Sequence, residues 1–242
     1  MTDDWRLRLR ALPFFGALRL FYHLIKSFET RRSALLMLRR PPGLFQPYGN
    51  TREDRYPKIF SHIRAMVADR RENHILSFGC STGEEVFTLA HYFNQAHIKG
   101  IDIDATRIKV AQRRAADLNL GDRISFINTA STKNEQSSSY DAVFAMAVFR
   151  HGALQNAPEA CSPWLHFDDF ERAVTDLARV IKPGGYLALS YSNFRFTDTA
   201  ASADFELAFA SPPDPATPIY GRDDRRHPAL ADGGIYRKLP FR

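Results

Sequence analysis

The chain has 242 residues, of which 44% are hydrophobic, and a formal net charge of +6 at pH 7. This composition is typical of a water-soluble globular protein with one large α/β domain, and it excludes a disordered chain; no apolar run approaches the roughly 20 residues that span a bilayer. Two cysteines, Cys80 and Cys161, are too few for a disulfide framework and lack partners at zinc-ligand spacing. We therefore expect a cytoplasmic protein with no structural metal.

The positive charge is concentrated in the first 40 residues, where nine cations stand against three acids. The remaining chain has 24 groups of each sign, and this neutral body makes a nucleic-acid partner an unfavourable hypothesis. Large apolar side chains alternate with the cations and predict one or two amphipathic helices, at about residues 4–28 and 29–39. This arm can pack on the domain, lie on an anionic membrane surface, contact an acidic partner or RNA, or cover the active site.

Turn-forming residues at 41–57 end the arm, so we divide the chain into a basic helical arm with linker, 1–57, and a main domain, 58–242. Beyond this point strand-like and helix-like segments alternate. This alternation is typical of a Rossmann-like, doubly wound and mostly parallel sheet with helices on both faces. Five β-α units are predicted between residues 58 and 200, with strands at 74–78, 97–101, 124–128, 142–146 and 186–190. Segments 218–220 and 235–239 are predicted to be the two strands that end the sheet.

The most informative segment joins the first predicted strand to a helix and has the sequence ILSFGCSTGEE. Gly79 and Gly83 bracket a tight turn, against which a ligand can lie, and exposed amides at the helix start can hold an anionic group. The glycine spacing differs from the dinucleotide-binding G-x-G-x-x-G, and Glu84 and Glu85 would oppose a pyrophosphate. S-adenosylmethionine has a net positive charge, so the acidic helix start favours this cofactor over NAD or ATP.

A second acidic element ends the next predicted strand, in the sequence GIDID. Asp102 stands 19 residues after Gly83, a position from which a carboxylate can accept both ribose hydroxyls of an adenosine ligand. Asp104 directly precedes a predicted helix and is better explained as its N-cap. We therefore assign Asp102 to the ligand and Asp104 to capping.

Four sequence elements, by their wording and their order along the chain, resemble the class I S-adenosylmethionine-dependent methyltransferases over about residues 58–192. They are the LSFGCSTGEE turn, the GIDID strand end, the YDAVFAMAVFRH strand and the LARVIKPGGYLALS helix-turn-strand. The resemblance implies S-adenosylmethionine as the cofactor, and methyl transfer to a small molecule, a lipid-like compound or a protein. It also implies that the glycine turn supports the methionine part, that Asp102 binds the ribose and that Ile103 packs on the adenine. The implied cofactor-binding residues are Gly79, Cys80, Ser81, Gly83, Asp102, Ile103, Ala130, Ser131, Met146 and Ala147.

Two positions depart from the pattern of this family. Members usually carry an acid where Ser77 stands, and often another after the third strand, where this chain has Thr129, Ala130 and Ser131. The first loss weakens the contact with the methionine end, and the second leaves adenine recognition to the backbone near Ala130 or to the Ser131 hydroxyl. The glycine turn is most similar to the chemotaxis receptor methyltransferases, which modify glutamate side chains, but that likeness is confined to the turn.

Methyl transfer from a sulfonium needs a base only if the acceptor must lose a proton. His151, five residues past Met146, is the candidate catalytic base, and a structural or binding role is its alternative. Residues 152–167 are expected to form the acceptor wall, residues 41–57 to close over the cofactor, and residues 193–196 to add to the mouth. Two other function classes remain open, a non-catalytic S-adenosylmethionine-binding regulator and a nucleotide-dependent oxidoreductase.

Overall fold

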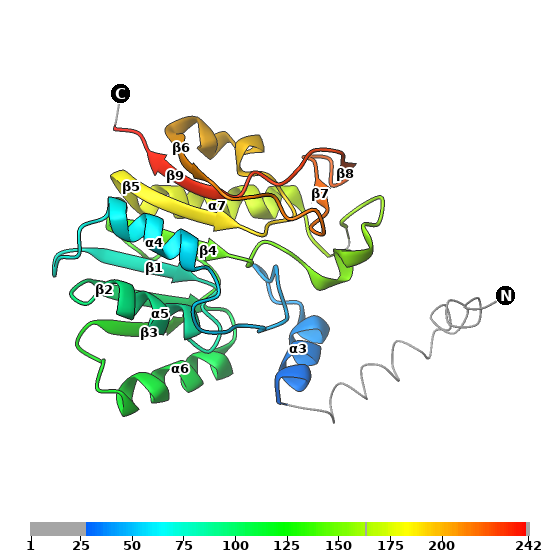
Figure 1. Ribbon diagram of the computed structural model, residues 1–242. Helices are drawn as coiled ribbons and strands as arrows, with labels where there is room; N and C mark the ends of the chain where they lie inside the picture. Colours follow the sequence, from blue (N-terminus) through cyan, green and yellow to red (C-terminus); the bar gives the residue numbers. More distant parts are fainter. Residues whose placement is uncertain (1–27, 163, 241–242) are drawn as a thin grey trace.

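A seven-stranded sheet forms the centre of the computed structural model, which describes residues 28–162 and 164–240 (Figure 1). Its strand order is β3-β2-β1-β4-β5-β9-β6, and the five strands from β3 to β5 are parallel while β9 lies antiparallel between β5 and β6. The order reverses between β1 and β4, and an open sheet leaves a crevice at the carboxyl ends of the strands at such a point. The strands are β1 His74–Phe78, β2 His97–Asp102, β3 Ile124–Asn128, β4 Tyr140–Met146, β5 Ile181–Ser190, β6 Phe205–Ala210 and β9 Gly234–Lys238.

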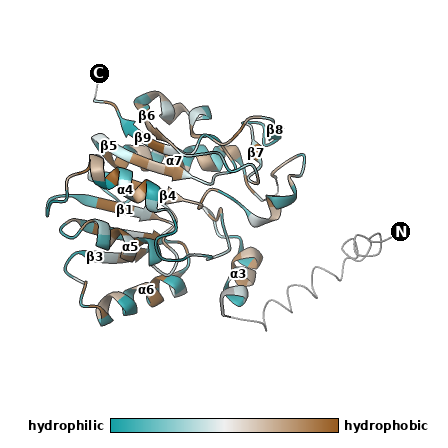
Figure 2. Ribbon diagram, viewed as in Figure 1, coloured by the Kyte–Doolittle hydropathy of each residue, from teal (hydrophilic) through white to brown (hydrophobic). Residues whose placement is uncertain are grey.

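Helices cover both faces of the sheet. The side chains of α4, α5 and α6 share one hydrophobic core with one face, and those of α7 share a second core with the other. Figure 2 shows hydrophobic residues gathered along the strands and on the helix sides turned toward them. The helices are α3 Phe28–Arg39, α4 Pro57–Met66, α5 Glu84–Tyr92, α6 Ala105–Asp117 and α7 Phe167–Val180, with 3-10 helices η1 Gly152–Asn156, η2 Phe196–Asp198 and η3 Ala200–Asp204.

The central strand β4 shows why the sheet is covered on both sides. Val143 and Ala145 belong to the core with α7, whereas Phe144 and Met146 belong to the core with α4, α5 and α6. Because successive side chains of a strand point to opposite faces, a continuous apolar run must be buried on both. This alternation fixes Met146, the last residue of β4, on the α5 side at the open end of the strand.

The predicted helix at 29–39 and the five predicted parallel strands are confirmed to within a few residues, except at the start of β5. The prediction of five β-α units is wrong at one place, since no helix lies between β3 and β4. Residues 182–185, the KPGG turn of the helix-turn-strand element, are part of β5. A bulge there separates the pair Tyr140 and Ile181 from the pair Ala142 and Tyr186. Gly184 takes φ +80° in this bulge, a conformation that favours glycine.

The C-terminal region differs from its prediction. Residues 235–239 were predicted as a sheet-ending strand, and β9 is confirmed there, but Ile219–Tyr220 (β7) pairs with Arg226–His227 (β8) in a separate two-stranded sheet. The actual edge strand is β6, which no pattern predicted, because its side chains are mostly exposed and do not alternate. Hydrophobic periodicity is weak in such an edge strand.

The described part of the basic arm packs against the domain. In α3, Ala34 and Leu36 are buried, and Arg32 forms an ion pair with Asp104. The predicted helix at 4–28 lies outside the described residues apart from its last position. None of the helices within 28–162 and 164–240 is long and apolar enough to cross a membrane. The boundary at residue 57 stays a prediction, although Phe45 and Tyr56 are buried in the two cores.

Candidate active site

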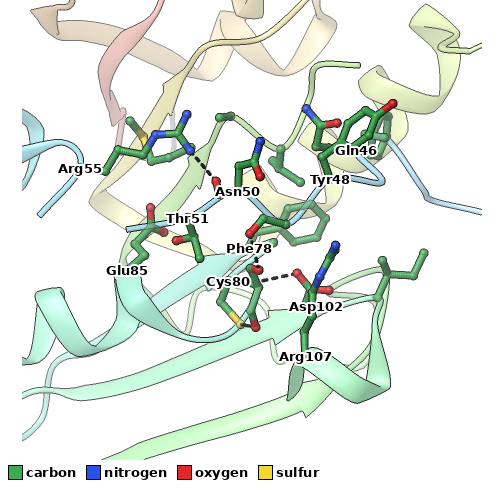
Figure 3. A pocket seen from close by; sticks show the side chains of 18 of the residues that line it. Gln46, Tyr48, Asn50, Thr51, Arg55, Phe78, Cys80, Glu85, Asp102 and Arg107 are labelled. Atoms are coloured by element: carbon green, nitrogen blue, oxygen red, sulfur yellow. Dashed lines mark hydrogen bonds between the residues drawn. The ribbon is translucent and has the colours of Figure 1, made fainter. Parts of the chain in front are cut away.

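A cavity lies at the carboxyl ends of β1, β2 and β4, and residues 41–56, which we name the strap, supply one of its walls (Figure 3). It is the place where the strand order reverses, as expected for a ligand site in this type of sheet. Gly83 and Ser131, two of the ten predicted cofactor-binding residues, are not among the described residues that line the cavity. The other eight line it: Gly79, Cys80, Ser81, Asp102, Ile103, Ala130, Met146 and Ala147.

The glycine turn after β1 is closed by its own hydrogen bonds. The amides of Gly79 and Cys80 both donate to the carbonyl of Ile101, at 2.8 and 3.0 Å, and the Gly83 amide donates to the Cys80 carbonyl. These three amides are therefore already paired, and the expectation that amides at the helix start hold an anionic group stays a prediction. A Cβ on Gly79 would lie 2.7 Å from a methyl carbon of Val148, so this glycine permits the close approach of β1 and the loop after β4.

Asp102 is held at the tip of β2 by backbone amides. Its Oδ2 accepts from the amide of Ser81 at 2.9 Å, and its Oδ1 accepts from the amide of Asp104 at 2.8 Å. Each carboxylate oxygen has a second lone pair, so two acceptor positions remain for ligand hydroxyls. Burial raises the pKa of Asp102, against the lowering effect of these two amides and of Arg107. The carboxylate is thus positioned before a ligand binds.

Asp104 caps α6 as predicted, accepting from the amides of Thr106 and Arg107. The sequence did not indicate its second partner, Arg32, whose Nε and Nη2 donate to the two carboxylate oxygens at 3.1 and 2.6 Å. Burial raises the pKa of Asp104, but the bonds from Arg32 and Thr106 outweigh this and hold it below its ordinary value. The contact ties α3 to the strand end that carries Asp102.

Glu85 is a cavity residue that sequence reasoning missed. It lies in the first turn of α5, and its Oε1 accepts a hydrogen bond from the hydroxyl of Ser77 at 2.8 Å. Burial raises the pKa of Glu85 to about 7, against the lowering effects of Ser77 and Arg55. The acid that family members carry in the first strand is absent at Ser77, and here Ser77 instead positions a carboxylate from the following helix.

Arg55 brings a positive charge to the same end of the cavity as Glu85, and Asp102 lies at the other end (Figure 3). Its guanidinium donates to the carbonyl of Asn50 at 2.8 Å and lies 5.2 Å from the centre of the Tyr56 ring. Arg55 is near enough to lower the pKa of Glu85, although the two form no direct ion pair among the described contacts. One end of the cavity therefore offers both a carboxylate and a guanidinium to a ligand.

The strap is fixed to the domain by several polar contacts. Arg107, which is almost fully buried, donates to the carbonyl of Pro47 at 3.0 Å, and the hydroxyl of Ser81 donates to the carbonyl of Gly49 at 3.3 Å. A Cβ on Gly49 would lie 2.5 Å from Nε of Arg107, so any larger residue there must displace the strap or the guanidinium. The predicted closure of 41–57 over the site agrees with this geometry, since Phe45, Tyr48 and Tyr56 all line the cavity.

His151, the candidate base, is not among the described residues that line the cavity. It caps η1, with Nδ1 accepting from the amide of Ala153 at 3.1 Å, and burial, followed by the charge of Arg40, lowers its pKa to about 4. An imidazole that accepts at Nδ1 carries its proton on Nε2, so in this tautomer Nε2 can donate but not accept. A catalytic role for His151 stays a prediction, and its contacts favour the structural alternative.

The cavity lining includes no described residue of the two other segments predicted to contact the acceptor, 152–167 and 193–196. Phe194 and Phe196 are buried in the core with α7 and do not reach the mouth. The side chain of Asn193 is occupied by the His151 amide and the Pro218 carbonyl. Gly152, at the start of the 152–167 segment, packs on Tyr48 of the strap. The loop after β4 lines the cavity instead, through Ala147 and Val148. Tyr191, which follows β5, packs against the cavity residue Tyr56 with the ring centres 5.4 Å apart.

Residues 69–216 match the family described as Methyltransferase domain. This chain belongs to that methyltransferase family. It is 27% identical to the O-methyltransferase rstn1 of Aspergillus nomiae over 66% of this chain and 65% of that protein. It is 29% identical to the fatty-acid O-methyltransferase of Mycolicibacterium smegmatis over 66% of this chain and 50% of that protein.

Among solved structures, this methyltransferase chain is similar to the geranyl diphosphate C-methyltransferase of Streptomyces coelicolor A3(2). The two are 13% identical with a TM-score of 0.40, and the match covers 54% of this chain and 43% of the other. The chain thus spans less than two thirds of the length of each of these three proteins.

Proposed function

We propose that this chain binds S-adenosylmethionine in the cavity and transfers its methyl group to an acceptor. The observation that carries the proposal is the distribution of charge along the cavity. One end has the carboxylate of Glu85 and the guanidinium of Arg55, and the other has the backbone-held carboxylate of Asp102. An α-amino acid has an ammonium and a carboxylate that match the first end, and a ribose has two hydroxyls that match the second.

The cavity residues divide between the parts of this cofactor. Asp102 would accept the ribose hydroxyls, Ile103 would pack on the adenine, and Gly79 and Ser81 would support the chain between the two ends. Glu85 would accept from the ammonium and Arg55 would donate to the carboxylate. Burial of these groups away from water strengthens each contact and makes any unpaired partner costly.

The sulfonium supplies an activated methyl group, so the protein's task is to align the acceptor with it. Met146 and Ala147 line the cavity at the open end of β4, and the acceptor would approach the cofactor past them. Ala147 has φ +57°, an uncommon value for a residue with a Cβ, and such conformations persist where the surrounding contacts enforce them. This backbone would shape the opening through which the methyl group passes.

The two relatives found by sequence, from Aspergillus nomiae and Mycolicibacterium smegmatis, are named as O-methyltransferases, which favours an oxygen acceptor for this chain. The glycine turn resembles the chemotaxis receptor methyltransferases only within itself, and we propose no glutamate modification from it. Contact of the basic arm with an anionic membrane surface is a separate proposal. Deleting residues 1–40 should then abolish retention on vesicles containing anionic lipid, and no retention of the intact chain would contradict it.

Calorimetry with S-adenosylhomocysteine and with NAD tests the cofactor proposal. We expect binding of S-adenosylhomocysteine and no heat with NAD. Binding of NAD alone would favour the oxidoreductase alternative. If S-adenosylhomocysteine binds but labelled S-adenosylmethionine transfers no methyl group to any component of a cell extract, the regulator alternative is favoured.

A further inference from the structure

The hydroxyl of Tyr56 is a buried polar group without a partner at the mouth of the cavity. Tyr56 lines the cavity, is only 9% exposed, and its hydroxyl forms no hydrogen bond among the described residues. An unpaired buried hydroxyl costs free energy, so such a group is expected to find its partner in a bound ligand. The cofactor contacts proposed above use Glu85, Arg55 and Asp102 and leave this hydroxyl free.

A charged group without a partner acts on this phenol from the loop after β4. Arg150, four residues beyond the end of β4, is half-buried, and its guanidinium forms no ion pair or hydrogen bond within 28–162 and 164–240. It is close enough to Tyr56 for its charge to act on the phenol. Burial raises the pKa of Tyr56 well above its ordinary value despite Arg55 and Arg150, so the hydroxyl stays protonated and can donate to an anion. The cavity is thus lined by one unsatisfied donor, the Tyr56 hydroxyl, and Arg150, which is not among the described lining residues, adds a positive charge near it.

The charge of the cavity favours an anion beside these donors. The charged residues that line it are three arginines and two acids, Arg52, Arg55, Arg107, Glu85 and Asp102. Bound S-adenosylmethionine would add a net positive charge. An acceptor with a negative charge offsets this excess, whereas a cationic amine would increase it.

The described residues that line the cavity offer no free base for deprotonating an acceptor. No histidine or lysine is among the described residues that line the cavity, and Glu85 and Asp102 are already committed to the cofactor. The cavity lining also includes apolar side chains, among them Phe60, Met146 and Val148. An acceptor that is already ionised near pH 7 needs no base, and its apolar part can contact these side chains.

We propose that the acceptor is an organic carboxylate with an apolar substituent, recognised by the Tyr56 hydroxyl and the Arg150 guanidinium and methylated on oxygen. This inference rests on the proposed function. One carboxylate oxygen accepts from Tyr56 and Arg150 while the other attacks the methyl carbon. The new C–O bond forms as the C–S bond breaks, and the electron pair of that bond goes to sulfur. The products are a methyl ester and S-adenosylhomocysteine, and no proton is transferred.

Binding of carboxylates to the protein saturated with S-adenosylhomocysteine provides the first test. Octanoate, dodecanoate, benzoate and phenylacetate are titrated beside their primary amides, which have the same shape without the charge. At least one acid is expected to bind at least tenfold more tightly than its amide. Tyr56→Phe and Arg150→Gln should each weaken that acid about tenfold and leave S-adenosylhomocysteine affinity unchanged. Tyr186→Phe and Arg113→Gln are the matched controls and should change neither affinity.

The chemistry of the product provides the second test. The protein is incubated with S-adenosylmethionine labelled in its methyl group and with the acid that binds, or with a deproteinised cell extract. A methyl ester releases its label as volatile methanol in alkali, whereas methyl ethers, methylamines and C-methyl groups keep it.

Release of the label supports the proposal. A label that resists alkali overturns it, as does the absence of any acid that binds better than its amide while S-adenosylhomocysteine binds. If S-adenosylhomocysteine itself does not bind, the proposed function fails before the acceptor is in question.

Discussion

The two ends of the cavity hold their carboxylates in different ways. Asp102 is fixed by two backbone amides at the tip of one strand, so its position is set by the sheet itself. Glu85 is held by the hydroxyl of Ser77 and faces Arg55 on the strap, so its position depends on three separate elements. The first end is preorganised for a ligand, and the second is adjustable and changes its charge near neutral pH.

The largest expected effect is that of Asp102→Ala. This change removes the ribose acceptor and leaves the amides of Ser81 and Asp104 without their partner. We expect S-adenosylhomocysteine binding to weaken by roughly 100-fold, and the free energy of unfolding to fall by about 3 kcal/mol. Calorimetry and urea unfolding measure the two losses. Unchanged affinity would remove Asp102 from the site.

Glu85→Gln tests the adjustable end through pH. The pKa of Glu85 is about 7 in the fold and 4.5 ordinarily, so between these values the folded state binds more protons than the unfolded state. Stability attributable to this group therefore falls as pH rises from about 4.5 to 7, by about 3 kcal/mol, and Glu85→Gln should remove that slope. Urea unfolding from pH 5 to 8 measures it, and identical slopes in both proteins would contradict the assignment.

The same substitution should alter the pH dependence of cofactor binding. Because the ammonium of S-adenosylmethionine favours ionised Glu85, affinity should rise about tenfold from pH 6 to 8 in the wild type. Glu85→Gln should bind more weakly at pH 8 and show little change with pH. Asp102→Asn serves as the comparison, since it should weaken cofactor binding without removing the increase in affinity from pH 6 to 8.

Gly49→Ala tests how far the adjustable end depends on the strap. The new Cβ would lie 2.5 Å from the guanidinium of Arg107, so Arg107 or the strap must shift, and the contact that fixes the strap near Arg55 is disturbed. We expect a loss of about 2 kcal/mol in unfolding free energy and a several-fold loss of S-adenosylhomocysteine affinity. Gly121→Ala is the control, because nothing lies within 4 Å of its added Cβ. Equal unfolding free energies and equal S-adenosylhomocysteine affinities in the two variants would show that the strap does not shape the site.

Arg32→Gln should have the smallest effect. It removes the ion pair of α3 with Asp104 but leaves the capping bonds of α6 intact. Because Arg32 is partly exposed, we expect a loss of about 1 kcal/mol, smaller in high salt. Arg39→Gln, an exposed position on the same helix, should change the urea midpoint negligibly. A shift of equal size in both would exclude a specific role for the pair.

Much of the preorganised end could be predicted from the sequence because its determinants are local. Asp102 directly ends an apolar strand, and Asp104 directly precedes a helical pattern, so strand, acid and cap follow within a few residues. The adjustable end could not be predicted in this way. Glu85 was visible only as a charge at a helix start, and its contact with Ser77 and Arg55 depends on how α5, β1 and the strap pack together.

The other features that the sequence did not predict have similar physical causes. The β6 strand is an exposed edge without alternating burial, and residues 182–185 form a bulge whose pairing depends on β4. The low pKa of His151 comes from burial beneath segments distant in sequence, which a histidine after a strand does not reveal. In each case the decisive contact is tertiary.

A crystal structure with S-adenosylhomocysteine tests the central claim most directly. The account predicts the ribose hydroxyls within hydrogen-bond distance of Asp102, the ammonium beside Glu85 and the carboxylate beside Arg55. A ligand bound in the reverse orientation, or outside the cavity between β1 and β4, would contradict it.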